Sequence, residues 1–324
     1  MRLVFMGTPA FAVPALEALA KAHDIRLVIT RPDRPRRRGG GPPEPSDVKA
    51  AARPLGLDVA EPPTLRDPAV VERLLAASPD VIVVVAFGLL LPEPVLAVPR
   101  LGSVNLHASL LPRWRGAAPV ARAILAGDAR TGVTTMRMER GLDTGPTLLS
   151  RACDIDPEET AGALTARLAA LGAPLLLETI AGLDAGAVTP TPQDEALATW
   201  APPLSRADAR LDWNETATSL AFWVRASQPW PIAEAMLNGR RVQILAAAAE
   251  PPVPAPADQG AGTREEPASG TVVAAGAVLR VACGGGTLLR VSRLRVAGGR
   301  AIGARDAVNG RLVAPGDRFT SIPT

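Results

Sequence analysis

The sequence has few of the residues that build metal centres or disulfide frameworks. Only two histidines, His23 and His107, and two cysteines, Cys153 and Cys283, occur in 324 residues. The cysteines lie far apart, and no Cys-x-x-Cys or paired-histidine spacing is present, so neither a zinc site nor a disulfide framework is predicted. We therefore expect reduced thiols, a cytoplasmic location and chemistry that needs no metal.

Long apolar runs are also missing. The most apolar stretch, residues 81–91, ends at Pro92 and is too short to span a bilayer. The chain reaches a Gly-Thr-Pro turn at residues 7–9, too early for a signal peptide. We expect no association with a membrane.

Lysine and tyrosine are almost absent. Lys21 and Lys49 are the only lysines among 35 basic residues, and there is no tyrosine. This bias is typical of a GC-rich genome, so a single arginine is no evidence of function. Clustering is more informative, because basic residues gathered in one place favour an anionic partner. One cluster lies between residues 31 and 38 and contains Arg31, Arg34, Arg36, Arg37 and Arg38. It is either a solvated, proline-stiffened loop or a nucleic-acid contact.

Strands and helices alternate in the first half of the chain. Strands are expected at 3–6, 25–30, 57–60, 81–86, 103–106 and 133–138, and helices at 11–20, 46–55, 70–77, 117–126 and 160–183. This alternation predicts an α/β fold, a Rossmann-like, mostly parallel sheet with helices on both faces. The first domain is expected to span residues 1–188.

The second half has a different composition. Residues 189–205 are rich in proline, threonine and alanine and are expected to form a linker. Residues 206–324 contain a helical pattern followed by short strand patterns, which predict a small, OB-like C-terminal β-barrel domain. Residues 250–270 are rich in proline, alanine and glycine, and we expect a mobile insertion there.

Two short polar groups in the first half contain the residue types needed for acyl transfer. Asn105 and His107 end a predicted strand, and Asp143 lies between Gly141 and Gly145. Ligands of open α/β sheets bind beyond the carboxyl ends of the strands, so Phe87, the first group and residues 138–143 are expected to converge. His107 can then act as a base that Asp143 orients, and Asn105 can donate to an oxyanion. Taken singly, each could equally be a buried or turn-forming structural residue.

These motifs together resemble the methionyl-tRNA formyltransferase family. The resemblance covers Asn105 to Pro119 and Gly141 to Gly145, and it extends to Met6–Pro9, Arg31–Pro35 and Arg225–Pro231. It implies transfer of a formyl group from the co-substrate 10-formyltetrahydrofolate to the α-amino group of methionyl initiator tRNA, for translation initiation. The first domain would then be the catalytic domain and the second would bind tRNA, and the protein is expected to be a monomer.

The same resemblance assigns roles to individual residues. It implies that the catalytic residues are Asn105, His107 and Asp143 and that the folate-binding residues are Ser109, Leu110, Leu111 and Pro112. Arg38 aligns with the arginine that binds tRNA in the family, and we expect Arg36 and Arg37 to bind tRNA with it. Lysines that often follow this arginine loop in the family are replaced here by Gly40 and Gly41. We expect Arg36 and Arg37 to supply that charge to phosphates.

Three alternatives remain open from the sequence. A formyltransferase for an amino-sugar nucleotide and a formylfolate hydrolase would use the same Asn, His and Asp residues with a different acceptor. A catalytically silent RNA-binding or folate-binding protein would not need all three. A nicotinamide enzyme is disfavoured, because Gly7-Thr8-Pro9 does not fit the Gly-x-Gly-x-x-Gly fingerprint.

Overall fold

The computed structural model describes residues 1–35, 43–250 and 267–323. They divide into two compact units. The first contains residues 1–120, 129–154 and 163–202, and the second contains residues 121–128, 155–162 and 203–324. Residues 189–202, which the sequence predicts to be most of the linker, therefore group with the first unit.

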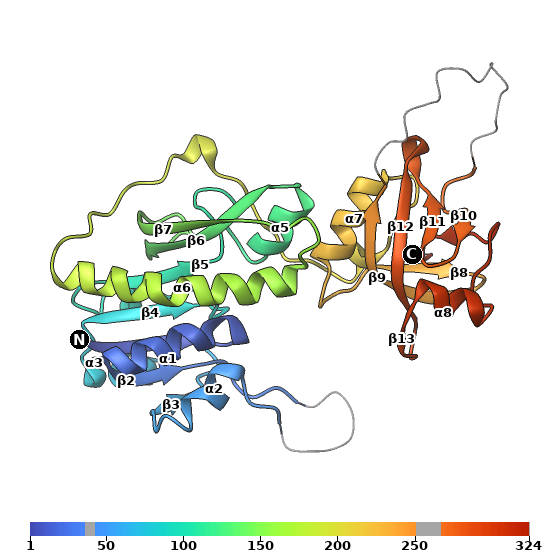
Figure 1. Ribbon diagram of the computed structural model, residues 1–324. Coiled ribbons are helices and arrows are strands. Elements are labelled where there is room, and N and C mark those ends of the chain that lie inside the picture. Colours follow the sequence, from blue (N-terminus) through green and yellow to red (C-terminus); the bar gives the residue numbers. More distant parts are fainter. Residues whose placement is uncertain (36–42, 251–266, 324) are drawn as a thin grey trace. The chain divides into compact units, whose positions relative to one another are not determined.

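A seven-stranded sheet in the order β3-β2-β1-β4-β5-β6-β7 forms the centre of the first unit (Figure 1). Its strands are β1 (Arg2–Gly7), β2 (Asp24–Ile29), β3 (Val59–Ala60), β4 (Val81–Val85), β5 (Ser103–His107), β6 (Arg130–Arg137) and β7 (Thr147–Asp154). Strands β1 to β5 pair in parallel. The predicted Rossmann-like, mostly parallel sheet is confirmed.

Strand β6 runs in the opposite direction, and β7 returns to the direction of β1 to β5. β6 is antiparallel to β5, with Asn105 opposite Met136, and β7 is antiparallel to β6. The segment after β6 therefore starts near the amino end of β5, and Met138 N–H donates to the Ser103 carbonyl. The expected approach of Asp143 from a neighbouring carboxyl end is wrong, because this hairpin loop instead folds back toward His107.

Helices cover both faces of the sheet, as the sequence predicts. In the first unit and at its borders they are η1 (Ala10–Ala12), α1 (Val13–Ala22), α2 (Asp47–Ala52), α3 (Pro68–Ala77), α4 (Glu93–Leu96), α5 (Pro119–Leu125), α6 (Ala161–Asp184) and η2 (Glu195–Leu197). One apolar cluster joins α3 and α4 to the sheet and includes Leu74, Val95, Ile82 and Val84. Phe87 belongs to this cluster, so its side chain lies in the core.

Helix α6 packs on the other face of the sheet (Figure 1). It is the one helix in the described ranges that is long and apolar enough to cross a membrane. Its Gly172 lies against Leu106 of β5, and the Thr179 hydroxyl is 2.8 Å from the Thr135 hydroxyl of β6. Leu164, Leu168 and Ile180 of α6 are also fully buried. We conclude that α6 is a core helix of this unit.

The second unit is a curved antiparallel sheet with two short helices. Its elements are η3 (Ala207–Ala209), α7 (Ala217–Ala226), β8 (Glu234–Leu237), β9 (Arg240–Ala249), β10 (Val272–Ala275), β11 (Leu279–Ala282), η4 (Gly284–Gly286), β12 (Leu288–Val296), β13 (Ala301–Gly303), α8 (Ala304–Asn309) and β14 (Phe319–Thr320). The strand order is β10-β11-β12-β9-β8-β14. Near the two edges, Val272 N–H donates to Asp317 O and Phe319 N–H donates to Gly270 O. The expected small barrel-like domain is confirmed as an antiparallel half-barrel.

Candidate active site

Strand β5 presents Asn105 and His107 on one face of the sheet. Because side chains alternate along a strand, both point away from Leu106, which contacts α6 on the opposite face. The Asn105 and His107 side chains are nevertheless almost completely buried, with 9% and 6% of each residue exposed. Two polar side chains buried together need partners, and the loop after β6 provides one.

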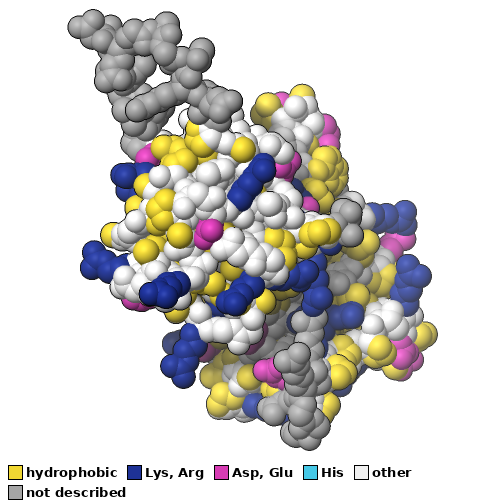
Figure 2. All heavy atoms as spheres, turned by 90° about the vertical axis from the view of Figure 1, so that its right-hand side faces the viewer, with side chains coloured by type: hydrophobic (Ala, Val, Ile, Leu, Met, Phe, Trp, Pro, Cys, Tyr) yellow, Lys and Arg dark blue, Asp and Glu magenta, His cyan; other side chains and the backbone are white. Residues whose placement is uncertain are grey.

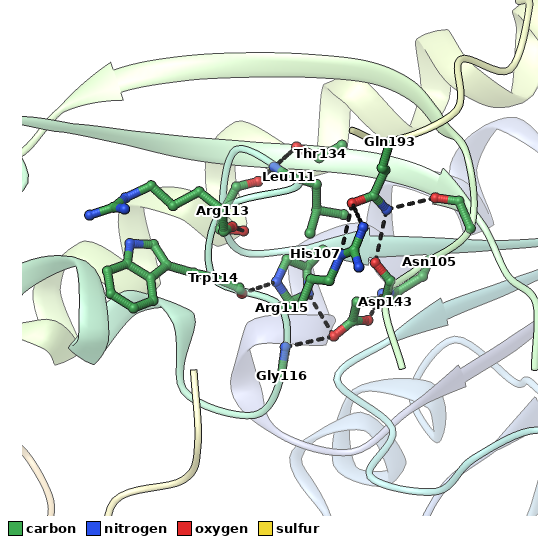
Figure 3. Close-up of polar contacts among 12 residues, drawn as sticks. Asn105, His107, Leu111, Arg113, Trp114, Arg115, Gly116, Thr134, Asp143 and Gln193 are labelled. Atoms are coloured by element: carbon green, nitrogen blue, oxygen red, sulfur yellow. Dashed lines mark hydrogen bonds and ion pairs between the residues drawn. The ribbon is translucent and has the colours of Figure 1, made fainter. Parts of the chain in front are cut away.

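The Asp143 carboxylate lies between two hydrogen-bond donors and the His107 ring (Figure 3). Oδ1 accepts a hydrogen bond from Asn105 Nδ2 at 3.3 Å, and Oδ2 accepts one from Gly116 N at 2.9 Å. Oδ2 is also 3.7 Å from His107 Nδ1, an ion-pair distance when the ring is protonated. The structure thus brings together the three side chains that the sequence groups as catalytic.

A backbone carbonyl determines the tautomer of His107. Nε2 of the ring lies 2.8 Å from the carbonyl oxygen of Trp114. A carbonyl can only accept, so Nε2 carries a proton and the neutral ring has its lone pair on Nδ1, which faces Asp143. The sequence predicts that Asp143 orients this base. Asp143 is placed to stabilise the cation that forms when Nδ1 takes up a proton.

Ser109 to Pro112 form a hydrogen-bonded turn beside the histidine. The Ser109 hydroxyl donates to Arg113 O at 2.6 Å, and Ser109 is only 1% exposed. Thr134 of β6 also holds the turn, since its hydroxyl donates to Ser109 O and accepts from Leu111 N. Ser109 therefore shapes this segment from inside, while Leu111 and Pro112 are half-buried and can contact a ligand.

Residues 191–201, which we call the strap, lie along the segment that follows this turn. Arg115 N donates to Thr199 O and Ala201 N donates to Arg115 O, as in a parallel strand pair. The Thr199 hydroxyl accepts from Trp114 N at 2.8 Å. Trp114 has a φ of 65°, an uncommon conformation for a bulky residue, and these contacts hold it there. The strap thus helps to hold the carbonyl that faces His107.

A fully buried arginine connects the strap to the Asp143 loop. Arg115 is 0% exposed, and its guanidinium donates to Gln193 Oε1 at 3.1 and 2.9 Å and to both oxygens of Glu195 at 2.8 Å. The hydrogen bonds from Arg115 hold the pKa of the Glu195 carboxyl below its usual value. The Gln193 amide nitrogen donates to Asp143 O at 2.8 Å and to Gly145 O at 2.7 Å.

The ends of the arginine loop are ordered around a buried lysine. Lys49 Nζ lies 2.7 Å from Asp33 and 2.5 Å from Glu61, and these two carboxylates raise the pKa of Lys49. Arg34 and Glu44 pair through both of their backbone groups. The residues predicted to bind tRNA, Arg36, Arg37 and Arg38, lie outside the described residues.

Comparison with known proteins identifies the family. Residues 1–180 match the family model described as formyl transferase, and residues 203–312 match the formyl transferase C-terminal domain. The chain is 48% identical over 315 residues to the methionyl-tRNA formyltransferase of Methylococcus capsulatus, covering 97% of this chain and 98% of that protein. The chain belongs to the methionyl-tRNA formyltransferase family. The same enzyme of Stenotrophomonas maltophilia is 50% identical over 315 residues, covering 96% of this chain and 98% of that protein.

More distant solved structures have the same fold as this methionyl-tRNA formyltransferase family member. HypX from Aquifex aeolicus in complex with tetrahydrofolic acid matches with a TM-score of 0.61 and 16% identity, covering 97% of this chain and 48% of HypX. An N-formyltransferase from Helicobacter canadensis, in complex with folinic acid and dTDP-3-aminofucose, matches with a TM-score of 0.62 and 15% identity, covering 90% of this chain and 98% of that one.

Sequence reasoning about this family member missed the strap and its partner. Gln193 lies in a stretch of prolines and threonines that is typical of a linker. No periodic pattern predicts that its side chain is hydrogen-bonded to the rest of the unit. Arg115 lies inside the motif that carries the family resemblance, yet an arginine in an arginine-rich chain is weak evidence of burial. No local signal around Arg115 predicts a partner 78 residues away.

Proposed function

We propose that this protein transfers the formyl group of 10-formyltetrahydrofolate to the α-amino group of methionine on initiator tRNA, for translation initiation. The observation that carries the proposal is the buried Asn105, His107 and Asp143 constellation in a chain 48% identical, over 97% of its length, to a methionyl-tRNA formyltransferase. The reaction is an acyl transfer from one nitrogen to another.

The three residues can supply each proton transfer that this reaction needs. The amine nitrogen attacks the formyl carbon, and neutral His107 accepts the amine proton at Nδ1 while the nearby Asp143 carboxylate stabilises the cation. The bond from the formyl carbon to the folate nitrogen then breaks, and the same proton passes to that nitrogen. Asn105 directs one amide N–H at Asp143, which leaves its second N–H to donate to the oxyanion.

The folate co-substrate is assigned to the turn at Ser109 to Pro112. The turn directly follows His107 on the chain, and its apolar members Leu110, Leu111 and Pro112 are half-buried, as is typical of residues that line a ligand site. Among the described residues, no group of three His, Cys, Asp or Glu side chains could hold a metal ion. We propose that proton transfer and charge stabilisation by these side chains are sufficient without one.

Basic residues of both units support a tRNA acceptor. The arginine loop contributes Arg36, Arg37 and Arg38, and the second unit exposes Arg280, Arg290 and Arg293 on β11 and β12. Arg280 and Arg290 are cross-strand partners, and the Glu250 carboxylate, 2.6 Å from Arg280 Nε, offsets the charge of that arginine. Figure 2 shows Lys and Arg side chains spread over the face in view, with fewer Asp and Glu side chains. We propose that the second unit binds the tRNA and that the protein works as a cytoplasmic monomer.

The acceptor specificity provides the decisive test. The protein is incubated with 10-formyltetrahydrofolate and either charged initiator or charged elongator methionine tRNA, and formylmethionine is measured after release from the tRNA. We expect formylation of the initiator only. Formylation of a dTDP-amino sugar would favour the sugar formyltransferase, release of formate without an acceptor would favour the hydrolase, and binding without turnover would favour a silent folate- or RNA-binding protein.

A further inference from the structure

We infer that Gln193 and Arg115 are positioning residues for Asp143, a role that rests on the proposed formyl transfer. Neither side chain is among the three catalytic groups. Together they connect the strap to the loop that presents the catalytic carboxylate (Figure 3).

The hydrogen bonds of Gln193 allow only one orientation of its amide. Its oxygen faces the Arg115 guanidinium, which can only donate, and its nitrogen faces the carbonyl oxygens of Asp143 and Gly145, which can only accept. The flipped amide would place N–H groups against N–H groups and oxygen against two oxygens. The buried guanidinium thus fixes the direction in which Gln193 donates.

The Asp143 loop needs such external support. Asp143 has a φ of 53°, in the left-handed region that non-glycine residues rarely adopt. A conformation of this kind persists where the surroundings hold it. Gln193 holds the carbonyls of Asp143 and Gly145, on either side of Thr144, while Gly116, the residue after Arg115, donates to the Asp143 carboxylate itself.

The consequence concerns the His107 ring. The Asp143 carboxylate stabilises the imidazolium only while it stays close to Nδ1, and a displacement of about 1 Å can reduce a rate by about 100-fold. Loss of the two N–H donors of Gln193 should therefore impair the chemical step and leave the binding of both substrates largely intact.

The experiment uses two substitutions that remove these donors in different ways. Gln193→Glu keeps an oxygen for Arg115 and places the other oxygen against the two carbonyls, whereas Gln193→Leu removes both kinds of contact without adding charge. For both we expect kcat of initiator tRNA formylation to fall by about 100-fold, with KM for tRNA and folate changed less than about threefold. Glu195→Gln, which keeps a neutral acceptor for Arg115, is the control and should stay within about threefold of wild-type kcat.

A second readout does not depend on turnover. With only two histidines in the chain, the His107 imidazole signal can be followed by NMR and assigned with a His23 variant. In Gln193→Leu this signal should move from its wild-type chemical shift, because the Asp143 carboxylate no longer lies close to Nδ1. An unchanged signal together with kcat within about threefold would overturn the inference. An inactive wild type, with a signal that moves in Gln193→Leu, would instead contradict the proposed function and support the positioning role.

Discussion

His107 has a different partner at each ring nitrogen, and the two partners do different things. The Trp114 carbonyl at Nε2 fixes where the proton of the neutral ring lies, and the Asp143 carboxylate near Nδ1 favours the cation. A histidine held in this way has a defined orientation and a defined base atom before any substrate arrives. Its contribution should therefore appear in the rate of the chemical step.

We expect His107→Ala to lower kcat by about 100- to 10,000-fold, the usual contribution of a positioned acid or base. Because the side chain is buried and bonded within the catalytic domain, KM for tRNA should change little. Single-turnover formylation with pre-bound tRNA measures the step directly. A residual rate within tenfold of wild type would show that another group carries the proton.

The two cysteines should differ in reactivity. Neither forms a disulfide, but Cys283 is buried in the apolar core of the second unit, and this burial raises the pKa of its thiol to about 11. Only the thiolate reacts, and at pH 8 a group of that pKa is ionised in about one molecule in a thousand. We expect a thiol reagent at pH 8 to modify Cys153 first. Mass spectrometry of the digested protein gives the site, and both cysteines should react in denaturant.

Ionisation of Cys283 also makes the stability of the folded protein depend on pH. Its pKa is raised by folding, so the folded protein holds this proton more tightly than the unfolded chain does, whose thiol has a pKa near 9.0. The contribution to stability is therefore constant below pH 9 and decreases as the pH rises toward about 11. Replacing Cys283 with alanine should remove this part of the alkaline sensitivity.

At the scale of the element, the loop between β6 and β7 is tightly packed. Alanine substitutions at two of its glycines should therefore affect kcat to different extents. A Cβ at Gly145 would lie 2.0 Å from the Arg137 carbonyl, and that backbone is fixed because Arg137 N–H donates to Pro146 O. A Cβ at Gly141 would meet only the Thr144 side chain. Gly145→Ala should thus displace Asp143 and lower kcat at least tenfold.

Gly141→Ala is the matched control, since the Thr144 side chain can rotate away at a modest cost. We expect its kcat to stay within about threefold of wild type. Thermal unfolding of both variants separates a local displacement from a loss of the fold. Equal kcat values for the two would argue against a fixed Asp143 loop.

The elements that the sequence predicts well are those whose pattern has a single interpretation. Residues 81–85 are consecutive β-branched residues and can only be a buried strand, and residues 103–107 end at the motif that defines the site. β7 is harder to predict, because its buried Leu148 is followed by Ser150 and Arg151 at the edge of the sheet. Its direction, and that of β6, follows from a hairpin whose loop contains no strong turn signal apart from Gly141 and Gly145.

The strap shows a second limit of sequence reasoning. Its proline-rich composition predicts a linker, and it says nothing about what the segment contacts. The partners of Gln193 lie about 50 and 78 residues away in sequence, and hydrogen bonds of that range have no local signature. The residues that we propose as catalytic could be predicted from a motif, whereas the residues that we infer to orient them could not.

At the scale of the whole molecule, the proposed tRNA partner predicts a salt dependence. Neutralising phosphates releases counterions, so log Kd should rise linearly with log salt concentration. Arg36→Ala combined with Arg37→Ala should weaken initiator tRNA binding and reduce the slope by about 0.7 to 0.9 for each lost phosphate contact. Filter binding at several salt concentrations measures both quantities.

The matched control for the arginine loop is Arg66→Ala combined with Arg73→Ala, two exposed arginines elsewhere in the first unit. These substitutions should leave the slope of log Kd against log salt concentration unchanged. Unchanged tRNA affinity in the Arg36 and Arg37 double variant would contradict the assignment of the loop to phosphates.

Lys49, enclosed by Asp33 and Glu61, has a practical consequence for amine chemistry. A reagent that acylates unprotonated amines finds this ammonium buried and held in its charged form. Lys21 is exposed on α1 and, apart from the N-terminal amine, is the other primary amine in the chain. A fluorophore or surface linker applied under mild conditions should therefore attach near the start of the first unit, giving a nearly uniform orientation without engineering.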